Sequence, residues 1–157
     1  LGSKEQVALM LDLFDRFGQN ALKLVDPVMA DNGVLYGGFA PDFPQEMKRL
    51  CAKADVIVPN FTEAALMLGE PYVAGPYTKA YIEGLLRRLT AVCPGKIVLT
   101  GVFFDDTAVG AAAYDPAADR VDYALAARVP GYFHGAPGHS QHIPAHKPVN
   151  AADTNGT

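Results

Sequence analysis

Residues 55–69, DVIVPNFTEAALMLG, join a short aliphatic run to a polar turn and then to a helical pattern. The run at 55–59 is continuously apolar, as in strands that are buried on both faces. Residues 62–69 predict a helix, and Gly69 is a typical end signal for it. The stretch therefore predicts one strand–helix unit of an α/β fold, with Asn60 in the turn between strand and helix.

The same alternation continues on both sides of this unit. Helices are predicted at 3–17, at 44–54 and around the apolar stripe Ile82, Leu85, Leu86 and Leu89, and Ser3 with Gln6 has the spacing of a capping box. Strands are predicted at 21–28 and 96–100, a turn-rich stretch lies between 30 and 43, and a hairpin is predicted at 109–129. This order predicts an α/β fold with a mostly parallel sheet covered on both faces and an antiparallel hairpin at one edge.

Polar side chains follow the three predicted parallel strands. They are Asp26 and Asp31 after the first, Asn60 and Glu63 after the second, and Thr100 and Gly101 after the third. Ligands of such sheets bind outside the carboxyl ends of the strands. Carboxylate and amide oxygens suit Mg²⁺, and a helix N-terminus favours an anion, so the pattern predicts a metal–phosphate site. Each residue taken singly is also ordinary in a cap or a turn, as is Thr62.

Composition and charge exclude several classes of protein. Half of the 157 residues are hydrophobic, as is usual for a globular protein. The net charge is -4 and the sequence has no basic patch, so nothing in its charge favours a nucleic-acid partner. The longest apolar runs are shorter than a membrane span, and the opening LGSKEQ lacks the pattern of a signal peptide. We expect a cytoplasmic protein in which Cys51 and Cys93, predicted to lie in helices, are free core thiols.

The last part of the sequence differs from the rest. Residues 136–157 contain three prolines and three of the four histidines, with neither helical nor alternating periodicity. We predict a domain over residues 1–135 followed by an irregular or disordered tail over 136–157.

Four motifs in order resemble the bacterial pyridoxal/pyridoxamine (vitamin B6) kinases of the ribokinase-like superfamily. They are DPVMADNGVLY (26–36), ADVIVPNFTEA (54–64), KIVLTGV (96–102) and RVPGYFHG (128–135), and the N-x-x-E element in the second is the most specific. The resemblance implies part of a three-layer α/β/α sandwich. It also implies a reaction in which the γ-phosphoryl group of ATP, with Mg²⁺, passes to the 5′-hydroxyl of a B6 vitamer.

The resemblance also assigns roles to individual residues. Asp26 and Asp31 would lie near the phosphates and the metal, and Asn60 and Glu63 would organise Mg²⁺ through water. Thr100 would contact the nucleotide phosphates, Gly101 and Gly135 would belong to the cofactor-binding set, and the glycine-rich segment around Tyr36 would cover the site.

Two departures from the family pattern affect the expected activity. Family chains are nearly twice as long, and the N-terminal part that holds most of the pyridoxal contacts would precede this sequence. Family members continue from Gly135 into a G-T-G-D element whose aspartate is the catalytic base, whereas here Pro137 follows shortly and no aspartate occurs before Asp153. We therefore expect no catalytic residue in this chain and no kinase activity from it alone.

Two other functions stay open on the sequence. One is a non-catalytic nucleotide-binding or interaction module, whose uncovered strands would seek a partner, with a homodimer as a candidate assembly. The other is a fragment of a hydroxymethylpyrimidine-type kinase, because the part that would contact the substrate is not in the sequence.

Overall fold

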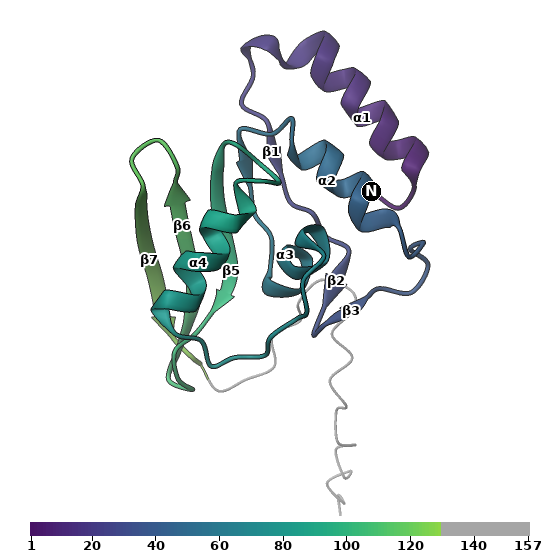
Figure 1. The fold of residues 1–157 in the computed structure, drawn as a ribbon. Coiled ribbons are helices and arrows are strands. Elements are labelled where there is room, and N and C mark those ends of the chain that lie inside the picture. The colour runs from purple at the N-terminus through teal and green to yellow at the C-terminus, as the bar shows by residue number, and fades with distance from the viewer. Residues whose placement is uncertain (130–157) are drawn as a thin grey trace, which may run out of the picture.

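The computed structural model describes residues 1–129 (Figure 1). Its helices are α1 (Lys4–Phe17), a 3₁₀ turn η1 (Gly18–Asn20), α2 (Phe43–Cys51), α3 (Phe61–Leu68) and α4 (Lys79–Leu89). Its strands are β1 (Leu24–Val25), β2 (Ala30–Asp31), β3 (Val34–Leu35), β4 (Val56–Ile57), β5 (Lys96–Val102), β6 (Ala108–Asp115) and β7 (Arg120–Ala127). The predictions for Gly135 and for the tail at 136–157 fall outside the described residues.

The main sheet has the order β1-β4-β5-β6-β7, and β2 pairs with β3 as a separate small hairpin. Strands β1, β4 and β5 are parallel, while β6 and β7 are antiparallel to their neighbours. The predicted fold class, a mostly parallel sheet with a terminal antiparallel hairpin, is thereby confirmed.

The core lies on one face of this sheet. The connections from β1 to β4 and from β4 to β5 cross in the same direction, so right-handed crossovers place their helices on the same side. Ile57, Ile97 and Leu99 point to that side and are fully buried, and α4 packs on β5 and β6 in front of the sheet in Figure 1. The expected cover on the second face is not found among residues 1–129.

Helix ends follow the predicted signals, with one correction. Ser3 caps α1 by accepting the N–H of Gln6, but the Gln6 side chain accepts the N–H of Gly2, so the reciprocal half of that capping box does not form. Gly69 ends α3 in the left-handed conformation at φ 70°, as glycine readily does.

Three local predictions were wrong in detail. The strand expected at 21–28 is reduced to β1, because Pro27 has no N–H to continue a ladder. The stretch from residue 30 contains the β2–β3 hairpin, whose turn is formed by Asn32 and Gly33 at positive φ. Cys93 follows α4 instead of lying within it, although both cysteines are free and buried as expected.

Candidate functional site: a pocket at the carboxyl ends of β4 and β5

A reciprocal capping box begins α3 and anchors the site. Asn60 Oδ1 accepts the N–H of Glu63 at 2.9 Å, and Glu63 Oε2 accepts the N–H of Asn60 at 2.9 Å. The other carboxylate oxygen, Glu63 Oε1, accepts the N–H of Met29 at 3.1 Å. One side chain, only 2% exposed, therefore joins the helix to the segment after β1.

Burial dominates the ionisation of this carboxyl group. It raises the pKa of Glu63 from 4.5 to about 7, and the negative charge of Asp26 acts in the same direction. The hydrogen bonds donated by the N–H groups of Asn60 and Met29 stabilise the charged form and oppose the increase. Glu63 consequently changes charge close to neutral pH.

Two further bonds fix the β2–β3 hairpin against the same helix end. Asn60 Nδ2 donates to the carbonyl of Ala30 at 2.8 Å, and the N–H of Gly33 donates to Thr62 Oγ1 at 2.9 Å. At Gly33, a Cβ would lie 2.8 Å from the Tyr72 ring, so this position needs glycine for space as well as for its φ of 79°. These bonds hold the hairpin beside α3 and place Asp31 on the side of the site that the hairpin forms.

A pocket of about 150 Å³ opens where the hairpin, the start of α3 and the end of β5 meet. Its lining consists of Asp31, Asn32, Asn60, Phe61, Thr62, Tyr72, Tyr77, Thr100, Gly101 and Phe103. The Thr100 N–H donates to the carbonyl of Pro59 at 2.9 Å, which ties the two strand ends together. First-turn N–H groups of a helix have no intrahelical acceptor, so this polar floor suits an anion.

Aromatic side chains form one wall of the pocket. Phe61 stacks on Tyr77 with ring centroids 3.7 Å apart, and Tyr77 meets Phe103 edge-on at 5.3 Å. No pattern in the sequence indicated this wall, and none indicated that Thr62 accepts a hydrogen bond from the hairpin. Aromatic residues at 72, 77 and 103 lie outside any periodic pattern, so only their spatial clustering identifies them.

The predicted site residues are partly brought together. Asp31, Asn60, Thr100 and Gly101 line the pocket, and Glu63 lies buried behind its floor. Asp26 is exposed and outside the lining, yet partial desolvation raises its pKa.

Tyr36 belongs to the same electrostatic environment. Burial and the nearby charges of Asp31 and Glu63 raise the pKa of the Tyr36 phenol. The segment that carries it is held back by a bond from its own N–H to the carbonyl of Met29 at 2.9 Å.

The donor set limits the kind of metal site that these residues fit. Among residues 1–129 there is no group of three or more His, Cys, Asp or Glu side chains able to hold an ion. Both oxygens of Glu63 and the amide of Asn60 are engaged by the protein. The residues fit a Mg²⁺ held by one carboxylate, water and substrate phosphates, which is a common arrangement for this ion.

No protein-family model and no curated protein sequence matches the chain. Solved structures do match. A protein from Bacteroides thetaiotaomicron assigned as a phosphomethylpyrimidine kinase shares 34% identity at a TM-score of 0.78, over 85% of this chain and 46% of that one. Its orthorhombic form, which contains pyridoxal, shares 36% identity at a TM-score of 0.70, over 77% of this chain and 43% of that one. Pyridoxal kinase from Lactobacillus plantarum shares 37% identity at a TM-score of 0.72, over 84% and 46%.

These matches decide the fold. The chain has a partial ribokinase-like fold. It spans less than half the length of the three structures, so the ribokinase-like architecture is present here only in part. An ADP complex of Bacillus subtilis pyridoxal kinase, at 20% identity and a TM-score of 0.68 over 86% of this chain and 49% of that one, shows the shared fold alone. No helix within residues 1–129 has the length and apolar character to cross a bilayer.

Proposed function

We propose that this chain is the nucleotide-phosphate and metal part of an ATP-dependent kinase that acts on a small alcohol of the pyridoxal or hydroxymethylpyrimidine type. The observation that carries the proposal is the pocket at the carboxyl ends of β4 and β5, where Asp31, Asn60, Thr100 and Gly101 meet the start of α3. Phosphoryl transfer depends mainly on positioning and charge stabilisation, which a pocket of this kind supplies. A cytoplasmic location belongs to the same proposal.

Each residue has a definite task in this proposal. The Gly101 backbone would donate to phosphate oxygens, and the Thr100 hydroxyl would do so on giving up its 3.3 Å bond to the Pro59 carbonyl. The positive end of α3 would stabilise the phosphate charge. Asp31 would hold Mg²⁺, which neutralises phosphate charge when bound, and Asn60 and Glu63 would position the hairpin that carries Asp31. Asp26 is exposed beside these residues, and its negative charge would act by raising the pKa of Glu63.

Two kinds of alcohol substrate fit the comparisons. The Bacteroides thetaiotaomicron relative is assigned as a phosphomethylpyrimidine kinase, and one of its crystal forms contains pyridoxal. The Lactobacillus plantarum relative is a pyridoxal kinase. We favour a B6 vitamer as the substrate because of the RVPGYFHG motif at 128–135, and we keep hydroxymethylpyrimidine as the second candidate.

A non-catalytic nucleotide-binding module is the alternative in a different class. It is favoured by the absence of an aspartate between Gly135 and Asp153, where related kinases place the catalytic base. We expect the chain alone to bind nucleotide without turning over substrate. A homodimer is compatible with either function and is required by neither.

Calorimetric titration with Mg²⁺–ATP tests the proposed site. We expect binding by the unmodified chain, at least about 10-fold weaker binding by Thr100→Val, and a reduced dependence on Mg²⁺ in Asp31→Asn. Asp106→Asn, which removes an exposed loop carboxylate, is the matched control and should bind as the unmodified chain does. Absence of any binding would refute the phosphate site.

Activity assays test the expected inactivity of the chain alone. Release of ADP that depends on pyridoxal or on hydroxymethylpyrimidine would identify the substrate, and it would contradict both this inactivity and the non-catalytic module. Binding without such release is the expected result for the chain alone.

A further inference from the structure

The pocket that we assign to nucleotide phosphates has no lysine or arginine among its lining residues within 1–129. Of those lining residues, Asp31 alone carries a full charge at neutral pH, and Asp26 and the ionised form of Glu63 add negative charge close by. A polyphosphate stays negatively charged even with one Mg²⁺ bound. A cation at the edge of the pocket would therefore strengthen its binding by Coulomb attraction.

Arg128, the first residue after β7, places such a cation beside the pocket. Its guanidinium lies over the ring of Phe103, with Cζ 4.9 Å from the ring centroid, and Phe103 is part of the pocket lining. The Arg128 N–H donates to the carbonyl of Thr107 at 2.8 Å, which fixes this residue against the loop between β5 and β6. One backbone bond and one ring contact therefore hold the side chain at the aromatic wall.

The guanidinium of Arg128 has no carboxylate partner among residues 1–129. Asp105, an acid of the adjoining loop, accepts the N–H of Thr107 at 2.8 Å instead. Stacking on Phe103 uses the flat face of the guanidinium, whereas its N–H donors lie in the plane of the group. Those donors are therefore available to an anion.

We propose that Arg128 is a further phosphate-binding residue of this pocket, whose N–H groups donate to oxygens of the nucleotide polyphosphate. The inference rests on the proposed function, because it requires a nucleotide in the pocket. Arginine suits this task, since its planar fork matches two phosphate oxygens at once while its face stays on the aromatic ring. Arg128 would supply the positive charge that the lining within 1–129 lacks.

Calorimetric titration of the full chain with Mg²⁺–ATP and with Mg²⁺–tripolyphosphate tests the assignment. Arg128→Gln should weaken the binding of both ligands by at least about 10-fold, because it removes a charge-assisted contact. The loss should be equal for the two ligands, since the contact is with phosphate alone. Arg128→Lys keeps the charge without the fork and should recover part of the affinity. Raising the ionic strength from about 0.05 M to about 0.3 M should reduce the difference between the unmodified chain and Arg128→Gln.

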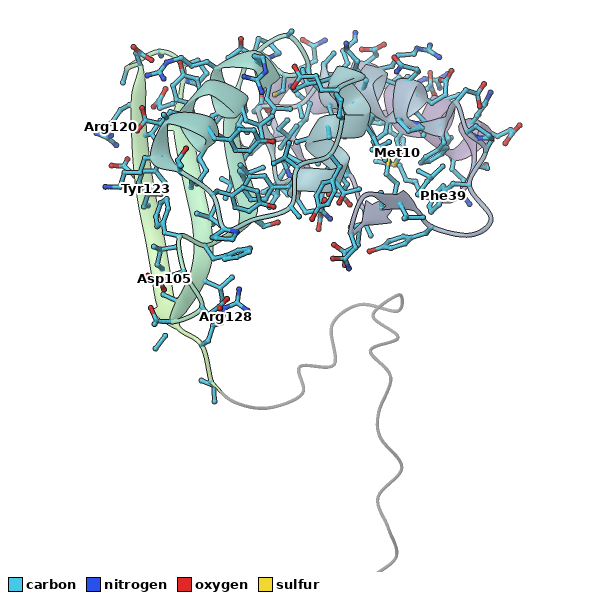
Figure 2. All side chains as sticks on the ribbon, turned by 60° about the horizontal axis from the view of Figure 1, so that its bottom comes forward. Met10, Phe39, Asp105, Arg120, Tyr123 and Arg128 are labelled. Atoms are coloured by element: carbon cyan, nitrogen blue, oxygen red, sulfur yellow. The ribbon has the colours of Figure 1, made fainter. Side chains whose placement is uncertain are left out.

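Arg120→Gln is the matched control. Arg120 begins β7 and pairs with Asp122 at 2.8 Å, and Figure 2 shows it at the opposite end of this strand from Arg128. At the usual rise of a strand the two arginines lie about 25 Å apart, which is more than the Debye length of about 10 Å at moderate salt. The control removes the same charge and should leave both affinities within about 2-fold. Circular dichroism establishes that each variant is folded, and both arginines are exposed.

Failure of this inference can be distinguished from failure of the proposed function. If the unmodified chain binds Mg²⁺–ATP and Arg128→Gln binds both ligands equally well, the role of Arg128 is refuted and the phosphate site stands. A loss for Mg²⁺–ATP without a loss for Mg²⁺–tripolyphosphate would place the Arg128 contact on the nucleoside and overturn the inference, as would equal weakening by Arg120→Gln. Absence of binding by the unmodified chain would overturn both proposals.

Discussion

Replacing Glu63 by glutamine should remove most of the pH dependence of stability that arises from the capping box. The Glu63 carboxyl group is buried and its pKa is raised to about 7 from its ordinary 4.5. A carboxyl group with a raised pKa binds its proton more tightly in the folded chain than in the unfolded chain. Its stabilising contribution is complete below about pH 4.5 and is lost as the pH rises through about 7.

The size of the effect follows from these two values. Each pH unit between them corresponds to about 1.4 kcal/mol. The part of this contribution that is lost between about pH 5 and pH 8 is roughly 2–3 kcal/mol of unfolding free energy. Urea denaturation at both pH values should show this loss in the unmodified chain.

The glutamine in Glu63→Gln cannot ionise. Between about pH 5 and pH 8, ionisation at position 63 should therefore change the unfolding free energy of this variant by less than about 0.5 kcal/mol. It keeps one oxygen acceptor where two N–H groups donate, so it should also be less stable at about pH 5, by about 1–3 kcal/mol. Glu70→Gln is the control, because it removes a more exposed carboxylate that pairs with Arg88. A pH dependence that is unchanged in Glu63→Gln would refute the assignment to Glu63.

Three further predictions concern other parts of the structure. Asn60→Ala should lower the unfolding free energy by about 2 kcal/mol in urea denaturation, because it removes both the helix cap and the bond to the hairpin, and Asn60→Ser should recover only the cap. Equal loss in both variants would contradict this division. Gly33→Ala should lower the melting temperature, since its Cβ would meet the Tyr72 ring at 2.8 Å and its φ is positive, and truncating Tyr72 in the same chain should recover part of the loss. No recovery would leave backbone strain as the whole cause. Cys51 and Cys93 should react with a thiol reagent only in denaturant, because both are buried and burial raises the pKa of Cys51 to about 12. Rapid reaction of the native chain at about pH 8 would show that the core opens.

The sequence by itself predicted those features that depend on neighbouring residues. Hydrophobic periodicity located the four helices and the order of the principal strands, and Asn60 and Gly69 marked both ends of α3. These signals are local, because a cap or a left-handed residue acts within one turn of chain. The fold class and the polar strand ends followed from the same patterns.

Only the tertiary structure decided which of those polar residues meet. In the sequence Thr62 was an ordinary residue for a helix cap, but in the structure its hydroxyl accepts a hydrogen bond from the N–H of Gly33, 29 positions earlier. Glu63 was an ordinary first-turn acid, but burial against the segment after β1 raises its pKa. The aromatic wall and the uncovered sheet face depend likewise on long-range contacts. Burial and proximity are properties of packing between distant segments, and no window of neighbouring residues contains them.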